Sequence, residues 1–287
     1  MVALALVACV QQEQPASFGS IRFDLAGAST KLIVLGTAAT PEGFDDPYRL
    51  QPRRPNALAL LAPAEQRVFL VGTPRGIVAQ MDALRSNPNL PTVKQAGLVI
   101  DGVVPVDASA STLDGLAELA ARPASAALAI YAVAGLELEL SHGLEQRGAR
   151  TACRFIGLQA ERPLDLCPGL SIHGARQAGP EGPLTFTIRG ARRAVLYAPS
   201  LSSSVDPFVA LREPLASSAI ALLSAAPFES GAIPPSGASN AAETTTVRAL
   251  LTSFEPEHRC LDPGSALRAQ LSALGAVVID DGFELWL

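Results

Sequence analysis

Short apolar runs of strand length recur along this chain, and two kinds of connection join them. Ala57–Leu61 and Arg67–Val71 flank a turn and predict a hairpin. Elsewhere the apolar runs are joined by segments with helical spacing of apolar residues, such as Gly76–Arg85. A sheet that contains both hairpins and helical crossovers has antiparallel and parallel neighbours. The alternation therefore predicts mixed β-sheets with helices packed outside them.

The order of these elements predicts the architecture. The expected strands are Lys31–Leu35, Ala57–Leu61, Arg67–Val71, Gly97–Ile100, Leu128–Ala132, Arg154–Leu158, Leu170–His173, Leu184–Ile188, Ala194–Tyr197, Ile220–Leu223, Ala276–Ile279 and Phe283–Leu287, the last two flanking a turn at Asp280–Gly282. The expected helices are Gly76–Arg85, Thr112–Ala121, Val133–Gln146, Ala241–Leu251 and Gly264–Leu274. We expect two mixed β-sheets packed face to face and flanked by helices, an αββα sandwich of the α/β (α+β) class, formed by residues 21–287 as a single domain. With 48% hydrophobic residues, the 287-residue chain can bury the core that this sandwich needs.

A loop between a buried strand and a helix, within Leu98–Leu116, offers a single acid. Asp107 is followed by small neutral residues, and Ser111 is placed to cap the next helix. Asp114 then falls in the first helical turn, where a negative charge is favourable. A partly buried Asp107 can act as a general base, and an acid at such a position can equally cap a turn or a helix. Both interpretations are open at this point.

The charge and the scarcity of histidine limit the functions open to the chain. Lys and Arg number 22 against 27 Asp and Glu, so the net charge is −5 and nucleic acid is not an expected partner. Only three histidines occur, and histidine is the commonest ligand of catalytic transition metals. We expect His142 on a helix surface. We expect His258 in a solvated charge cluster with Glu257 and Arg259.

The four cysteines, Cys9, Cys153, Cys167 and Cys260, form no CxxC pair, which argues against a zinc knuckle. We expect the last three to be small buried hydrophobes. A disulfide between Cys153 and Cys167 is the alternative, and it requires an oxidising compartment.

The N-terminal segment resembles a lipid-anchored terminus. Residues 1–10 are apolar, residues 11–20 are polar, and Leu6-Val7-Ala8-Cys9 resembles a bacterial lipobox. This predicts a lipid on Cys9, a location on the periplasmic side, and contact with a membrane only through that lipid. No basic residue precedes the apolar run, so a disordered or strand-forming terminus of a cytoplasmic protein is the alternative. No other segment reaches the roughly 18 apolar residues of a membrane-spanning helix.

Three further patterns are considered and set aside. Ser200–Ser204 lacks the glycines of a nucleophile elbow, and Gly36–Ala39 follows a strand without a GxGxxG pattern. Arg53-Arg54 and Arg192-Arg193 can pair with an anionic ligand, and exposed charge is the plainer interpretation of both pairs.

Several local matches, in the same order along the chain, resemble one known family. The matching segments are Lys31–Ala39, Arg54–Leu60, Phe69–Met81, Leu128–Ala132, Ala194–Ser200 and Gly275–Leu287. With them, the chain resembles the metallo-β-lactamase fold superfamily and, within it, the pyrroloquinoline quinone (PQQ) biosynthesis protein B family. The resemblance covers residues 31–287 and implies the same αββα sandwich.

The metal-binding motifs of that superfamily do not carry over. Its H-x-H-x-D-H motif falls on Asp107, Ser109, Ser111 and Thr112, and only Asp107 is an acid. The PQQ family has acids at the first two of these positions and keeps the closing Asp-His. Its cysteine-rich zinc segment falls on residues 40–53, where this chain has no cysteine.

The later motifs are missing as well. Ser224-Ala225-Ala226 stands where an acid-and-glycine turn is expected, and residues 231–248 contain no Met-Gly-His-Pro element. His173, which we expect at a strand end near the site mouth, can supply a second ligand beside Asp107. A catalytic zinc site needs three protein ligands, so the resemblance predicts a degenerate cleft with no metal and no cofactor.

The predicted function follows from that cleft. We expect a binding site formed by Asp107, Ser109, Ser111, Thr112 and His173 in a non-catalytic binding or accessory protein. Its partner is a small molecule or a protein, and the resemblance suggests a link to PQQ or quinoprotein systems. The alternative is an active oxygenase- or hydrolase-type metalloenzyme of PQQ biosynthesis that uses atypical ligands.

Overall fold

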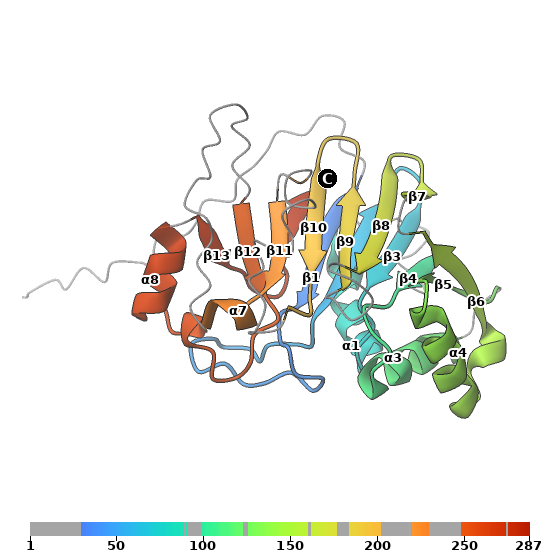
Figure 1. Ribbon diagram of the computed structural model, residues 1–287, viewed down its shortest axis with the longest axis horizontal. Helices are drawn as coiled ribbons and strands as arrows, with labels where there is room; N and C mark the ends of the chain where they lie inside the picture. Colours follow the sequence, from blue (N-terminus) through green and yellow to red (C-terminus); the bar gives the residue numbers. More distant parts are fainter. Residues whose placement is uncertain are drawn as a thin grey trace, which may run out of the picture.

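A computed structural model describes residues 30–88, 90, 99–122, 126–159, 162–176, 184–201, 218, 220–229, 248–273 and 275–287, which build two seven-stranded sheets (Figure 1). The first sheet has the order β14-β1-β2-β3-β4-β5-β6 and the second has the order β13-β12-β11-β10-β9-β8-β7. The first contains β1 (Lys31–Gly36), β2 (Ala57–Ala62), β3 (Arg67–Val71), β4 (Gly102–Val104), β5 (Leu128–Val133), β6 (Cys153–Leu158) and β14 (Glu284–Trp286). The second contains β7 (Leu164–Cys167), β8 (Leu170–Arg176), β9 (Leu184–Arg189), β10 (Ala194–Ala198), β11 (Ile220–Ser224), β12 (Arg248–Thr252) and β13 (Ala276–Val278).

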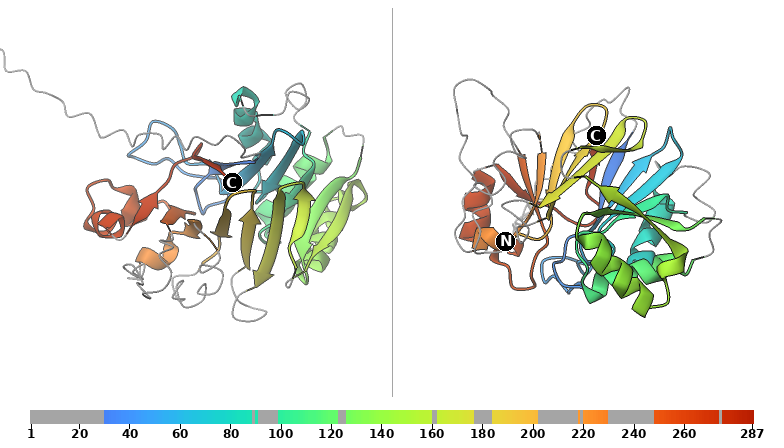
Figure 2. Two further views of the ribbon diagram at one scale, coloured as in Figure 1. Left: turned by 90° about the horizontal axis from the view of Figure 1, so that it is seen from above. Right: turned by 45° about the vertical axis from the view of Figure 1, so that its right-hand side comes forward.

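Helices flank both sheets, as Figure 2 shows. The α-helices are α1 (Ile77–Asp82), α3 (Ala110–Ala120), α4 (Leu136–Gln146), α7 (Ala226–Glu229) and α8 (Ala266–Ala273), and the 3-10 turns are η1 (Ala83–Ser86), η2 (Arg150–Ala152) and η3 (Arg259–Leu261). Helices α1, α3 and α4 lie against the first sheet, and α8 packs beside β13 of the second. The predicted αββα sandwich is confirmed.

Both sheets are mixed, for the reason that the sequence suggests. In the first sheet, β1, β2 and β3 pair antiparallel, with a hairpin between β2 and β3, and β3 to β6 pair parallel through helical crossovers. In the second, β7 to β10 form an antiparallel meander and β10 to β13 pair parallel. Central strands such as β1, β2, β10 and β11 are buried along their whole length, as expected for strands covered on both faces.

The alternation of side chains along β10 shows how the core divides. Val195 and Tyr197 point into the large cluster between the two sheets. Leu196 and Ala198 point the other way and join a second cluster, which also holds Phe228 of α7. Each sheet therefore buries one face against the other sheet and a second face against its helices or loops.

Several predicted elements are wrong in detail. A strand was expected at Gly97–Ile100, but the strand in this part of the chain is β4, which begins at Gly102. Val99, in the expected strand, is exposed. The helix expected at Ala241–Leu251 is wrong in its last four residues, which belong to β12, and its first seven lie outside the described residues. A short apolar run has no periodicity that separates a strand from a buried helix, so a parallel strand was mistaken for a helix.

The expected strands around Asp280–Gly282 do form, but they do not pair with each other. Strand β13 belongs to the second sheet and β14 to the first, so this turn carries the chain between the sheets. The helix expected from Val133 begins at Leu136, because β5 extends through Val133. The helix expected from Gly264 begins at Ala266.

The cysteines Cys153, Cys167 and Cys260 are buried and free. Burial raises the pKa of all three thiols, to about 11 for Cys167 and Cys260. These cysteines therefore act as small apolar side chains, and the disulfide alternative is not formed. Residues 1–29 lie outside the described part, so the lipid on Cys9 stays a prediction. No helix within the described ranges is long and apolar enough to cross a membrane.

Candidate binding cavity

A cavity of about 540 Å³ opens at the edge of the sandwich where strands of both sheets end. It is lined by Ala38, Ala39, Thr40, Pro41, Pro55, Asn56, Thr73, Pro74, Val106, Asp107, Ser109, Ala110, Ser111, Thr112, Pro199, Ser200, Leu201, Ser224, Ala226, Ser253 and Glu255. Most of these residues follow the carboxyl ends of β1, β3, β4, β10, β11 and β12. The segment that follows β1, blue in Figure 1, runs along this edge. Ligand sites of sheet proteins favour such edges.

The start of α3 forms one wall of the cavity. The helix begins at Ala110, and Ser109 is its N-cap: the Ser109 hydroxyl accepts a hydrogen bond of 3.3 Å from the Thr112 backbone N–H. Asp107 Oδ1 accepts two hydrogen bonds, of 2.9 Å from the Ser109 N–H and 2.6 Å from the Thr112 hydroxyl. Asp107 therefore stabilises the turn that leads into the helix.

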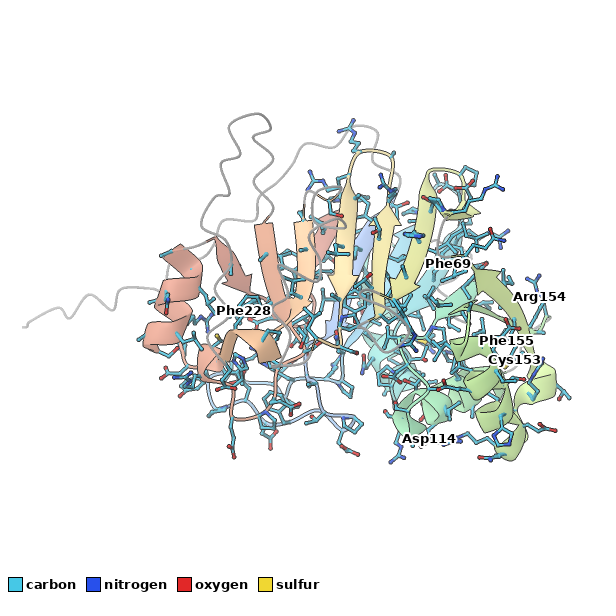
Figure 3. All side chains as sticks on the ribbon, viewed as in Figure 1. Phe69, Asp114, Cys153, Arg154, Phe155 and Phe228 are labelled. Carbon is cyan, nitrogen blue, oxygen red and sulfur yellow. The ribbon has the colours of Figure 1, made fainter. Side chains whose placement is uncertain are left out.

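The predicted cap at Ser111 is wrong by two residues. Ser111 lies inside the helix, and its hydroxyl accepts a 3.0 Å hydrogen bond from the Arg75 backbone N–H. Asp114 consequently lies beyond the first turn. There it pairs with the guanidinium groups of Arg75 and Arg147, whose hydrogen bonds lower the pKa of the Asp114 carboxyl (Figure 3).

Four of the five predicted cleft residues meet at the cavity. Asp107, Ser109, Ser111 and Thr112 all line it. His173 does not: it lies in the middle of β8, opposite Thr187 of β9, rather than at a strand end. The expected strand Leu170–His173 is too short: β8 continues to Arg176, so His173 is not at its end. Whether the four residues bind a ligand stays a prediction.

The floor of the cavity contains a residue that the sequence did not single out. Asn56, just before β2, donates from its side-chain amide to the Ser253 hydroxyl and accepts a 3.3 Å hydrogen bond from the Thr252 hydroxyl. The backbone N–H of Asn56 also donates to the Ala38 carbonyl at 2.9 Å. Asn56 thereby connects the start of β2 in one sheet to the end of β12 in the other.

Two buried hydroxyls have no hydrogen-bond partner among the described residues. Tyr197 of β10 is fully buried in the core between the sheets and does not line the cavity. Burial, and then the negative charge of Asp107, raise the Tyr197 pKa, and the Asn56 side chain opposes that rise. The Thr73 hydroxyl, on the cavity wall, also has no partner within the part of the chain that the structure describes. Unsatisfied buried groups are rare in folded proteins and often mark functional sites.

A charged network lies beside the cavity. The Arg53 guanidinium donates to Asp46 Oδ2 at 2.7 Å, to the Thr37 hydroxyl at 2.7 Å and to Asp280 Oδ1 at 3.0 Å. It also stacks over the Phe254 ring, 4.9 Å from its centroid. Arg53 is only 2% exposed, so the interpretation of Arg53 as exposed charge is wrong. Its donors are committed to the protein rather than to an anionic ligand.

His258 supports the opposite wall and is also not where it was predicted. It is 2% exposed, its Nε2 bonds the Ala225 carbonyl at 2.9 Å, and its Nδ1 accepts from the Cys260 N–H at 3.2 Å. This pattern requires the neutral ring with the proton on Nε2. Burial lowers the pKa of His258. The expected solvated cluster is therefore wrong: the imidazole fixes the turn that carries Ser224 and Ala226.

No protein-family model and no curated protein sequence matches this chain. Solved structures do. The structure of Zn²⁺-bound PqqB from Methylobacterium extorquens matches with a TM-score of 0.65 and 19% identity, over 90% of this chain and 100% of that one. The chain has the metallo-β-lactamase fold. YhfI from Bacillus subtilis, a metallo-β-lactamase fold protein, matches with a TM-score of 0.56 and 16% identity, over 89% of this chain and 99% of that one. A diphosphatase of the PhnP family matches with a TM-score of 0.57 and 16% identity, over 90% and 98%.

The metallo-β-lactamase fold implies metal ligands at this edge, and the residues present do not fit them. Zinc takes three or four ligands from histidine, cysteine and carboxylate side chains. The described lining offers two carboxylates, Asp107 and Glu255, and none of the three histidines of the chain. Within the described ranges, no group of three or more His, Cys, Asp or Glu residues is placed to hold a metal ion. The remaining polar side chains of the described lining are mostly serine and threonine hydroxyls.

Proposed function

We propose that this protein is a non-catalytic binding or accessory protein that uses the cavity for a small molecule or a protein partner. The single observation that carries the proposal is the donor set at the cavity, where Ser109, Ser111 and Thr112 stand at positions that the fold uses for metal ligands. Neutral hydroxyls are poor ligands for zinc and iron, and they are common in sites that hold ligands by hydrogen bonds.

The bonding of Asp107 supports a binding role over an acid–base role. Its Oδ1 already accepts hydrogen bonds from the Ser109 N–H and the Thr112 hydroxyl. These bonds stabilise the start of α3, as in a helix cap. No histidine borders the cavity to act as a general base or to orient a nucleophile. These features support a binding site over a hydrolytic one.

The cellular setting is a second part of the proposal. Likeness of fold to PqqB suggests an accessory role near PQQ or quinoprotein systems, and this step is an analogy between folds. A lipid on Cys9 would hold the domain, which we take to be residues 21–287, on the periplasmic side of a membrane. Mass spectrometry of the native protein tests this: an unmodified Cys9 that is still preceded by residues 1–8 would contradict it.

Metal content tests the central claim. The protein is expressed with added iron and zinc, purified without a chelator, and assayed for both elements. We expect far less than one equivalent of either, and no rise in thermal midpoint when either ion is added. Asp107→Asn is the matched variant, because it keeps the shape and an acceptor oxygen. About one equivalent of tightly held metal that Asp107→Asn loses would overturn the proposal in favour of a metalloenzyme with atypical ligands.

A further inference from the structure

The described lining of the cavity carries negative charge and no positive charge. Its ionisable residues are Asp107 and Glu255, and neither Lys, Arg nor His contributes to it. Three guanidinium groups outside the lining are paired: Arg75 and Arg147 with Asp114, and Arg53 with Asp46 and Asp280. A ligand carboxylate or phosphate would therefore meet like charge in the described lining, and such juxtapositions oppose binding.

The same lining is rich in groups that bind hydroxyls. Serine and threonine residues provide most of its polar side chains: Thr40, Thr73, Ser109, Ser111, Thr112, Ser200, Ser224 and Ser253. Both intramolecular bonds to Asp107 go to Oδ1, which leaves Oδ2 to accept a hydrogen bond from a ligand. A carboxylate flanked by hydroxyls can accept from and donate to a polyol or bind an ammonium group.

The buried Thr73 hydroxyl provides an independent observation. It lines the cavity and has no hydrogen-bond partner within the described residues. A buried hydroxyl without a partner destabilises the folded state. That cost is removed if a ligand, or a water that the ligand orders, completes the hydrogen bond.

We propose that the cavity binds a polyhydroxylated small molecule without negative charge, of the size of a sugar or an amino sugar. The volume of about 540 Å³ lies in the range of small-molecule sites. Asp107 Oδ2 accepts from a ligand hydroxyl or ammonium, and the Thr73 hydroxyl bonds a second polar group of the ligand. This inference rests on the proposed binding function and adds the chemical class of the ligand.

A series of sugars that differ in charge tests the inference. D-glucose, D-glucosamine, D-gluconate and glucose 6-phosphate are titrated against the whole protein at fixed ionic strength, with binding followed by calorimetry or by NMR shifts. We expect saturable binding of glucose and glucosamine, and at least about tenfold weaker binding of the two anions, which corresponds to about 1.4 kcal/mol. Tighter binding of either anion, or no saturation with any of the four at tens of millimolar, would overturn the inference.

Variants locate the binding. Asp107→Asn is expected to remove most of the preference for glucosamine over gluconate. Thr73→Val is expected to weaken glucose binding several-fold while leaving the thermal midpoint unchanged or higher. Thr151→Val, at an exposed threonine outside the lining, is the matched control and should change neither. A lower midpoint with unchanged binding in Thr73→Val would assign the hydroxyl a structural role instead.

The two proposals fail in different ways. One equivalent of bound iron or zinc would overturn the binding function, whatever the sugar titrations show. A metal-poor protein that prefers gluconate or glucose 6-phosphate would overturn only the ligand class.

Discussion

Two polar regions lie side by side at one edge of the sandwich, and they are built on opposite principles. The first is the network around Arg53, in which the guanidinium meets Asp46, Thr37, Asp280 and the face of Phe254. The second is the cavity floor around Asp107, Asn56 and Thr73. The network is charged and closed, with its donors committed, whereas the floor is mostly neutral and leaves Asp107 Oδ2 and the Thr73 hydroxyl unbonded within the described structure.

The difference separates charge that supports the fold from polarity that is available to a ligand. Asp280 lies 227 residues after Arg53, so the network ties the loop after β1 to the turn between β13 and β14. A buried ion pair of this kind is costly to break because each partner leaves the other unpaired. An open polar floor contributes less to stability, because its groups are not all satisfied. Perturbing the network should therefore act mainly on folding, and perturbing the floor mainly on binding.

The largest expected effect comes from the centre of the network. Arg53→Met replaces the guanidinium by an apolar chain of similar length and leaves the Asp46 carboxylate, which is 1% exposed, without its partner. We expect a loss of about 3–5 kcal/mol in the free energy of unfolding, measured with urea. Arg54→Met is the control, because only the backbone N–H of Arg54 bonds to Asp281, and it should change stability by less than about 0.5 kcal/mol. Equal losses in both variants would contradict the structural role of Arg53.

The next effect concerns the packing of the cavity wall. Gly115 of α3 lies so close to the loop after β3 that a Cβ atom would sit 2.2 Å from the Thr73 carbonyl oxygen and 2.4 Å from that of Pro74. Backbone atoms yield little, so Gly115→Ala should cost about 1–3 kcal/mol and displace a wall that lines the cavity. Gly157→Ala, in β6, meets no atom within 4 Å and should be neutral or slightly stabilising. Wild-type stability of Gly115→Ala, from urea unfolding, would show that the helix can move away from this loop.

A smaller effect distinguishes the observed helix cap from the predicted one. Ser109→Ala removes the hydroxyl that accepts from the Thr112 N–H, and should cost about 1 kcal/mol of unfolding free energy. Ser111→Ala removes only a solvent-exposed contact to the Arg75 N–H, so its cost should stay within about 0.5 kcal/mol. Thermal or urea unfolding of the two variants decides between the positions. A larger loss in Ser111→Ala would restore the cap predicted from the sequence.

The confirmed parts of the fold are those that local patterns determine. The hairpin at Ala57–Leu61 and Arg67–Val71 and the helical segment from Gly76 follow from residue spacing within a few positions. Asp107, Ser109, Ser111 and Thr112 line one cavity because they lie within six residues of one another, where a loop leads into a helix. The order of the elements then determined the sandwich, since hairpins and crossovers restrict how strands pair.

The missed parts depend on contacts between distant segments. Arg53 and His258 were interpreted as exposed charge, because nothing near Arg53 in the sequence shows its pairing with Asp280, and nothing near His258 shows its bond to Ala225. Asn56 reaches the floor because β2 begins at the edge where β10, β11 and β12 of the other sheet end. The signal that was present is modest: Asn56 is a polar residue at the start of an apolar run, where side chains meet the site edge.

The smallest expected effect tests whether His258, like Arg53, supports the fold rather than ligand binding. Burial lowers its pKa in the folded state, below the ordinary value of 6.5, and Glu229 at 4.0 Å opposes that shift only partly. The unfolded chain therefore takes up the proton first as the pH falls. The stability that His258 contributes is fully present above about pH 6.5 and is lost progressively as the pH drops from there toward the lower folded-state pKa.

His258→Gln keeps a donor for the Ala225 carbonyl and should flatten this part of the pH dependence, as measured by urea unfolding between about pH 7.5 and 5.5. One proton limits the change in slope to about 1.4 kcal/mol per pH unit, and only a fraction of that is expected. A steeper slope in His258→Gln than in the wild type would mean that the folded protein stabilises the imidazolium. That outcome would contradict the structural role of the neutral imidazole.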